Sequence, residues 1–263
     1  MSSPHLPQEI RDIIIDLLHD KTETLKQCCL VSKSWVSRPR KHLFAHIEIV
    51  GEWDLCKWNR LFPDPTNSPA CYAHTLSVDG SFGEAGERSW IHAFSHLERL
   101  IVECGYLGLD VGYSLVPFRI VAPSLKSLHV NSIVGTPHSH VFGLISSLPH
   151  LEDLTLRGND MTISNQGSNG PPTGTIPPVS SALTGTLELI LESMERSLHL
   201  LLDLPGRLHF RKIVLDSWFN EKNLPLVERL VAACSDTLEC LDIAYKVELD
   251  CTPNFVSLFD RNL

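Results

Sequence analysis

The chain has 263 residues, of which 43% are apolar and 20% are charged, which is the composition of a folded globular protein and not of a disordered one. Its net charge of −9 is uneven: the first 50 residues carry seven basic and six acidic side chains, and the remainder carries 15 basic and 25 acidic ones. Such an acidic body argues against binding to a nucleic-acid backbone, which needs clustered Lys and Arg. The one basic cluster, Lys33, Arg38, Arg40 and Lys41, is interpreted as a solvated helix face.

The cysteines and the N-terminus indicate the compartment. Eight cysteines include no Cys-x-x-Cys pair, and their spacing matches no zinc-binding framework. The opening MSSPHLPQE has no basic region followed by an apolar run, so it does not resemble a signal peptide. No uncharged apolar stretch reaches the roughly 18 residues that span a bilayer. We therefore expect a reduced, soluble protein of the cytoplasm, the nucleus or both, with no membrane partner.

The first helix is expected to start at Pro7, because proline suits the first helical position. Apolar side chains then recur with helical spacing along one stripe: Ile10, Ile13, Ile14, Leu17 and Leu18. A second helix follows, capped by Asp20 or Thr22. Its inner side is expected to hold Leu25, Cys28, Cys29 and Leu30.

Pro39 interrupts the next region, so we expect one short helix that ends near Val36 and another that begins near Arg38. A strand from Ile47 to Val50 closes the stretch. Such short helices cannot bury enough apolar surface to be stable alone. The rest of the chain or a partner must therefore cover them, which is typical of a docking module.

The stretch from Leu6 to Ile49 resembles an F-box. Three groups of residues carry the resemblance: the opening Leu6-Pro7 with Glu9-Ile10, the central Leu30-Val31-Ser32-Lys33 with Trp35, and the closing Leu43-Phe44. An F-box implies binding to the Skp adaptor and, through it, to a cullin scaffold, as the substrate-recognition subunit of an SCF-type ubiquitin ligase. The resemblance implies adaptor contacts at Leu6, Pro7, Ile10, Ile14, Leu30, Val31 and Trp35. The alternative is a non-enzymatic leucine-rich-repeat scaffold whose N-terminal helices only cap the solenoid.

The rest of the chain repeats one motif, L-x-x-L-x-L, which we call the repeat motif. Its copies are Phe44-Ile47-Ile49, Ala73-Leu76-Val78, Leu97-Leu100-Val102, Leu125-Leu128-Val130, Leu151-Leu154-Leu156, Phe210-Ile213-Leu215 and Leu238-Leu241-Ile243. A degenerate copy at Leu187, Leu189 and Leu191 lies in the longest gap. The other copies lie 24 to 29 residues apart, the period of leucine-rich repeats. Helix-like segments lie between copies, at 89–95, 139–147, 193–202 and 224–234. The irregular copies resemble the divergent repeats that follow fungal F-boxes.

We therefore expect an α/β fold in two parts. Residues 1–46 form a three-helix F-box-like module, and residues 47–263 form an irregular leucine-rich-repeat solenoid, a curved parallel sheet with helices on its convex face. The module should join the first repeat with no flexible linker. Residues 162–182, rich in Ser, Asn, Gly and Pro, predict a flexible insertion. The sequence stops before an obvious polar cap, so an incomplete C-terminal cap is one interpretation.

The sequence contains no recognisable active site. There is no G-x-S-x-G, phosphate-binding loop or H-E-x-x-H motif. His92 and His96 have the spacing of a helical metal pair but lack a third ligand, so we interpret them as structural and expect no metal or cofactor. A binding protein is the expectation, with a protein target of unknown identity on the concave face of the sheet. The candidate target contacts are Glu98, Arg99, Lys126, His129, Glu152, Asp153, Arg211, Lys212 and Asp242.

Overall fold

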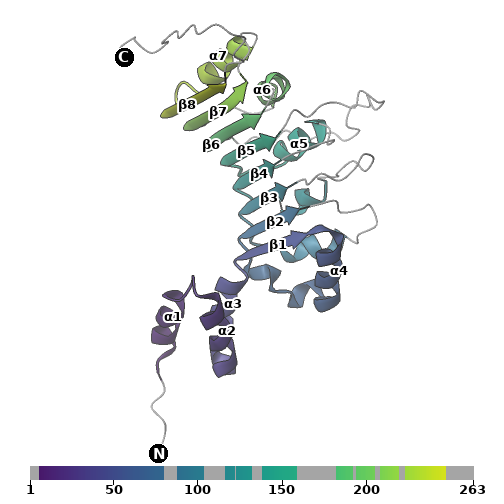
Figure 1. Ribbon diagram of the computed structural model, residues 1–263, viewed down its shortest axis with the longest axis vertical. Coiled ribbons are helices and arrows are strands. Elements are labelled where there is room, and N and C mark those ends of the chain that lie inside the picture. Colours follow the sequence, from purple (N-terminus) through teal and green to yellow (C-terminus); the bar gives the residue numbers. More distant parts are fainter. Residues whose placement is uncertain are drawn as a thin grey trace, which may run out of the picture.

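The computed structural model describes residues 6–79, 88–103, 116–121, 123–131, 138–158, 182–191, 194–204, 208–218 and 223–246. Within these ranges, eight strands form one parallel sheet in the order of the sequence (Figure 1). The strands are β1 (His46–Val50), β2 (Thr75–Asp79), β3 (Arg99–Glu103), β4 (Ser127–Asn131), β5 (Asp153–Gly158), β6 (Thr186–Leu191), β7 (Lys212–Trp218) and β8 (Cys240–Lys246). The expected α/β class with a parallel sheet is confirmed.

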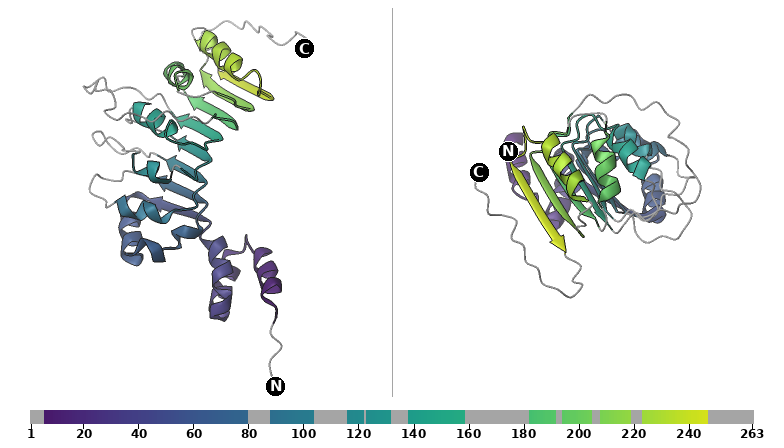
Figure 2. Two further views of the ribbon diagram at one scale, coloured as in Figure 1. Left: turned by 180° about the vertical axis from the view of Figure 1, so that it is seen from behind. Right: turned by 90° about the horizontal axis from the view of Figure 1, so that it is seen from above.

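Helices form the N-terminal module and cover one face of the sheet (Figure 2). The α-helices are α1 (Gln8–Asp16), α2 (Thr22–Val31), α3 (Ser37–Leu43), α4 (Gly51–Leu61), α5 (His138–Ile145), α6 (Glu195–Leu202) and α7 (Leu224–Ala233). Short 3-10 helices are η1 (Lys33–Trp35), η2 (Pro65–Asn67), η3 (Pro69–Tyr72), η4 (Arg88–Ala93) and η5 (Val116–Val121). The opposite face of the sheet, here called the open face, carries no helix in the described ranges.

The repeat motifs stack in register. Leu76, Leu100 and Leu128 are paired partners on consecutive strands, and all three side chains are buried. The degenerate copy follows the same rule, because Leu187 of β6 lies opposite Leu154 of β5. Strand side chains alternate between the two faces, so these positions all enter one continuous core with the helices. The solenoid is thus built from the residues that the repeat motif marks.

A ladder of shared carbonyl groups marks where each strand begins. The Ala45 carbonyl oxygen accepts hydrogen bonds from the amides of His74 and Thr75, at 2.9 and 3.0 Å. The same arrangement recurs one repeat later, where the His74 carbonyl oxygen accepts the amides of Glu98 and Arg99. Further carbonyls that each accept two amides of the next repeat belong to Glu98, Lys126, Gly185 and Arg211. Buried backbone groups must be paired, so this ladder fixes the register of each repeat relative to the repeat before it.

One step of the ladder differs. The Glu152 carbonyl oxygen accepts only the amide of Gly185, because the next amide, that of Thr186, donates to the Asp153 carboxylate at 2.9 Å. A Cβ atom at Gly185 would lie 2.7 Å from an Asp153 carboxylate oxygen and 2.7 Å from the Glu152 carbonyl oxygen. Glycine is therefore needed here for close approach of two repeats.

Several local expectations were wrong. Helix α4 was not predicted, although Gly51 starts it directly after β1 with a φ of 67°, a backbone angle that glycine adopts at low cost. The segment expected to be helical at 89–95 forms the 3-10 helix η4. Neither Asp20 nor Thr22 caps α2, because its N-cap residue is Lys21, with no side-chain capping bond. The predictions for the insertion, almost all of 162–182, and for the C-terminal cap fall outside the described residues.

The module and the first repeat are continuous, as expected. Helix α3 ends at Leu43 and β1 begins at His46. Between them, Phe44 packs against the core of the repeats and Ala45 starts the carbonyl ladder. The joint is therefore held by the partly buried contact of Phe44 as well as by backbone hydrogen bonds.

Replacing Gly185 by alanine should destabilise the chain by roughly 1–3 kcal/mol, because the added methyl group forces the backbones of two repeats apart. Urea unfolding followed by circular dichroism measures the change. The matched control is Thr184→Ala, since Thr184 is exposed one residue earlier. Equal unfolding midpoints for the two variants would show that the close approach carries no stability.

Candidate functional site

Helix α1 has its apolar side chains on the outside. Ile13 is 56% and Leu17 is 74% exposed, and Leu6, Ile10 and Ile14 are also exposed. Its one buried residue is Ile15, which is fully enclosed. Single exposed apolar residues are ordinary, but a row of them along one helix marks an interaction surface.

The inner side of α1 is held by polar contacts. The Arg38 Nε of α3 donates to the Asp16 carboxylate at 2.7 Å, and a second guanidinium nitrogen of Arg38 bonds the same group. The His42 Nε2 lies 2.8 Å from the carboxylate. Farther along α1, the Arg11 guanidinium donates to the Ser34 hydroxyl at 2.8 Å. Helix α1 is therefore fastened to the module through charge, which leaves its apolar stripe free.

The Asp16 carboxylate is strongly stabilised in its charged form. Its hydrogen bonds from Arg38 and then from His42 hold the pKa of this carboxyl well below its usual range, despite some desolvation. A carboxyl whose pKa is depressed by folding adds stability above its unfolded pKa, near 4, and loses that stability as the pH falls. Because the Asp16 side chain is 37% exposed, solvent screens part of this effect.

The end of α2 exposes a second apolar group. Leu30 is 78% exposed and Val31 is exposed, whereas Leu25 and Cys28 are buried. The expectation that Leu30 lies on the inner side of α2 is therefore wrong for the isolated chain. Ser34 lies in η1, directly after α2, and accepts a hydrogen bond from Arg11 of α1. The two apolar groups are therefore linked through η1. We call them together the docking surface: Leu6, Ile10, Ile13, Ile14, Leu17, Leu30 and Val31.

The structure thus places most of the predicted adaptor contacts on the outside. Pro7 is exposed with them, and Trp35 is half-buried. Ile13 and Leu17 were not among the predicted contacts, although they are more exposed than Ile10 or Ile14. The sequence does place Ile13 and Leu17 in the apolar stripe of this helix. Which part of the stripe faces outward depends on the contacts that Asp16 and Arg11 make with the module, and these do not appear in the spacing.

The open face gathers the predicted target contacts in parallel rows. Arg99, Asp153 and Lys212 stand at the first position of their strands. His129 and Asp242 stand two residues farther along β4 and β8. Glu98, Lys126, Glu152 and Arg211 precede the strands, at the carbonyl ladder. The set therefore extends from β3 to β8 and is not one compact site.

Several charged side chains next to the carbonyl ladder form ion pairs with one another. The Lys126 ammonium lies 3.0 Å from the Glu98 carboxylate, which His74 also approaches at 3.9 Å. The Lys126 hydrogen bond lowers the pKa of Glu98. At the other end, Arg211 pairs with Glu239 at 3.0 Å. These exposed pairs contribute little stability each, but they leave less unbalanced charge to attract a ligand.

The centre of the open face surrounds His129. Its Nε2 lies 3.1 Å from the Ser127 hydroxyl, and burial, followed by the charge of Arg99, lowers its pKa. Two strands away, Glu188 accepts hydrogen bonds from Arg157 at 2.7 Å and from the Thr155 hydroxyl at 3.2 Å. Glu188 was not predicted as a site residue, because it lies inside the degenerate motif. The lowered pKa leaves His129 neutral at pH 7.

The described residues offer little for catalysis. No group of three His, Cys, Asp or Glu side chains in the described ranges is placed to hold a metal ion. Burial raises the pKa of the Cys29 thiol and of the Cys234 thiol, which disfavours the reactive thiolate. Among the helices that the structure describes, none has both the length and the apolar character needed to cross a bilayer.

The chain matches no protein-family model, no curated protein and no solved structure. The geometry of the docking surface and of the open face is therefore the basis for assigning a function.

Replacing Asp16 by asparagine should loosen α1, because the substitution removes the charge that binds Arg38 and His42. We expect a local loss of roughly 1 kcal/mol, seen as faster hydrogen exchange of the α1 amides at pH 7. The wild-type chain should lose this protection progressively as the pH falls from about 4 toward the depressed pKa of Asp16.

The matched control for this test is Asp20→Asn, because the ion pair that Asp20 forms within the described ranges is with its exposed neighbour Lys21. Exchange that is equally fast in the two variants would contradict the role of Asp16. Wild-type protection that stayed the same between neutral and acidic pH would contradict it as well.

Proposed function

We propose that the chain is the substrate-recognition subunit of an SCF-type ubiquitin ligase. It would bind the Skp adaptor through residues 6–46 and a target protein through the open face of the sheet. The observation that carries the proposal is the packing of helix α1, which contacts the module through Asp16, Arg11 and one buried apolar residue, Ile15, and leaves its other apolar side chains exposed.

The inversion supports docking for an energetic reason. Fully burying one Leu or Ile side chain against a partner contributes about 1.5–3 kcal/mol, so several on one surface can supply a stable interface. A helix that served only to complete the fold would turn these residues inward. Here Ile15 alone is turned inward, beside the polar contacts of Asp16 and Arg11, so the rest of the apolar stripe is free for a protein that covers it.

In this proposal the chain performs no chemistry. It would hold the target near a catalytic subunit, and proximity alone raises the rate of a transfer reaction. The repeats would provide the target arm, in keeping with the leucine-rich-repeat interpretation. Among the basic candidate contacts on that arm, Lys126 and Arg211 form ion pairs, whereas Arg99 and Lys212 form none with the described residues and so keep their charge available.

The alternative is a leucine-rich-repeat scaffold whose helices α1–α3 only cap the first strand. The packing of Phe44 and the place of Ala45 in the carbonyl ladder favour it, because a cap needs such a joint. The two functions differ in what the docking surface does. A cap needs the inner contacts alone, whereas an adaptor needs the outer stripe.

A charge placed in the docking surface should weaken adaptor binding without unfolding the chain. We expect Leu17→Glu and Leu30→Glu each to weaken co-purification with a co-expressed Skp adaptor by at least about thirtyfold, as hot-spot changes of about 2 kcal/mol do. Isothermal titration gives the affinity, and circular dichroism confirms that the variants fold.

The matched control is Trp53→Glu, since Trp53 is 81% exposed on α4, outside the docking surface. Failure of the wild-type chain to bind the adaptor would reject the proposal and leave the scaffold. Adaptor binding that is unchanged in both variants would show that the docking surface is not where the adaptor binds.

A further inference from the structure

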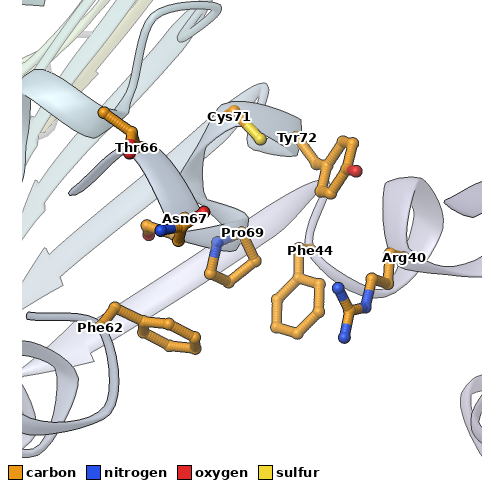
Figure 3. Close-up of a pocket in the computed structure, with 9 residues that line it drawn as sticks. Arg40, Phe44, Phe62, Thr66, Asn67, Pro69, Cys71 and Tyr72 are labelled. Carbon is orange, nitrogen blue, oxygen red and sulfur yellow. The ribbon is translucent and has the colours of Figure 1, made fainter. Parts of the chain in front are cut away.

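A pocket of about 350 Å³ lies where the N-terminal module meets the first repeat (Figure 3). Its wall is formed by Arg40 of α3, by Phe44 after that helix and by Phe62 after α4. Residues of η2 and η3, among them Asn67, Pro69, Cys71 and Tyr72, complete it. The pocket does not include any residue of the docking surface.

The pocket combines aromatic walls with one cation. Figure 3 shows the rings of Phe44 and Phe62 on either side of Pro69, with the Arg40 guanidinium beside Phe44. Aromatic rings and proline offer apolar contact to a planar side chain. The volume is at the small end for organic ligands and suits a single large side chain better than an extended molecule.

The Arg40 side chain is not used to hold the described part of the fold together. Its side chain is exposed and forms no hydrogen bond or ion pair with the part of the chain that the structure describes. Arg38, two residues earlier, is by contrast engaged by Asp16. A planar guanidinium with free donors suits a carboxylate, which it can bind through two hydrogen bonds.

The carboxylate nearest in sequence to the pocket wall is already used locally. Asp64 accepts hydrogen bonds from the Thr66 amide at 3.0 Å, the Thr66 hydroxyl at 2.7 Å and the Asn67 side-chain amide at 2.7 Å. These bonds lower the pKa of Asp64 and hold its carboxylate on its own turn. Asp64 therefore does not neutralise Arg40, and a bound carboxylate is best placed on the Arg40 side of the pocket.

We propose that this pocket binds an acidic peptide segment of a partner protein, with an aromatic side chain inserted between Phe44 and Phe62 and a neighbouring carboxylate on Arg40. The adjoining Lys41 is also exposed, which extends the positive charge along α3. This second contact would lie at the rigid joint, on a chain whose net charge of −9 otherwise repels acidic partners. It does not depend on adaptor binding.

Cys71 provides a direct readout, because it lines the pocket and is exposed, whereas Cys56 and Cys240 are exposed elsewhere. The probe is the blocked peptide Asp-Glu-Phe-Glu-Asp, added to the full chain during alkylation with iodoacetamide. Mass spectrometry follows each cysteine. We expect saturating peptide to slow alkylation of Cys71 by roughly tenfold, since only the unliganded fraction reacts, and to leave Cys56 and Cys240 unchanged.

Two control peptides and two variants test the assignment. Protection should be lost when the peptide carries Ala in place of Phe, or Gln in place of its acidic residues. It should also be lost in Arg40→Glu and be retained in Arg60→Glu, because Arg60 is exposed on α4 and does not line the pocket. Circular dichroism confirms that both variants fold.

Absence of Cys71 protection would overturn the proposal, as would equal protection by the Gln peptide or equal slowing at all three cysteines. The outcome is separate from adaptor binding. Leu17→Glu should leave the peptide's protection of Cys71 unchanged, and Arg40→Glu should leave adaptor binding through the docking surface unchanged. The failure of one proposal is therefore distinguishable from the failure of the other.

Discussion

The fold depends on a backbone constraint: the last carbonyl before each strand must pair with the amides that open the next strand. The Glu98 carbonyl, for example, accepts the amides of Lys126 and Ser127 at 2.8 and 2.9 Å. These hydrogen bonds hold consecutive strands in register. The buried leucines of neighbouring strands are thereby brought opposite one another. The segments between strands are not bound by it, so they can be an α-helix such as α6 or a 3-10 helix such as η4. Irregular repeat lengths are therefore compatible with a regular sheet.

The same constraint explains why the strands were predictable from sequence. In the copies of the repeat motif from Ala73 to Leu156, and in the copy Phe210-Ile213-Leu215, the first apolar residue is buried and the last two enter the core, whereas Leu241 in the last copy is 40% exposed. The two residues after the first apolar one lie at the ladder. Leu97, Leu100 and Val102 show the pattern, and all three are buried. Helix α4 was not predicted, although Leu55 and Trp58 lie three residues apart on the side that contacts the core. Two apolar residues with helical spacing are a weak signal in so short an element.

The docking surface was only partly predictable, for a related reason. Helix α1 carries apolar residues on more than one side, and Ile15 is the one that the module buries. The sequence predicts a stripe, but it does not say whether the chain or a partner covers it. That choice is made by distant residues, Arg38 and His42, which bind Asp16 and so rotate the stripe outward. A contact between residues more than twenty positions apart leaves no trace in local spacing.

In the proposed function, the joint between helix α3 and the first repeat connects the docking surface to the open face of the sheet. A recognition subunit that acts by proximity is effective only if the bound target stays at a fixed position relative to the adaptor. Phe44 packs against the repeats while Ala45 begins the ladder, so a turn of helix α3 relative to the first repeat would break a partly buried contact and the first hydrogen bonds of the ladder. The orientation of the open face is thereby set from the first strand onward. The pocket lies at this joint, so a peptide bound between Phe44 and Phe62 would contact both parts and further restrict their relative motion.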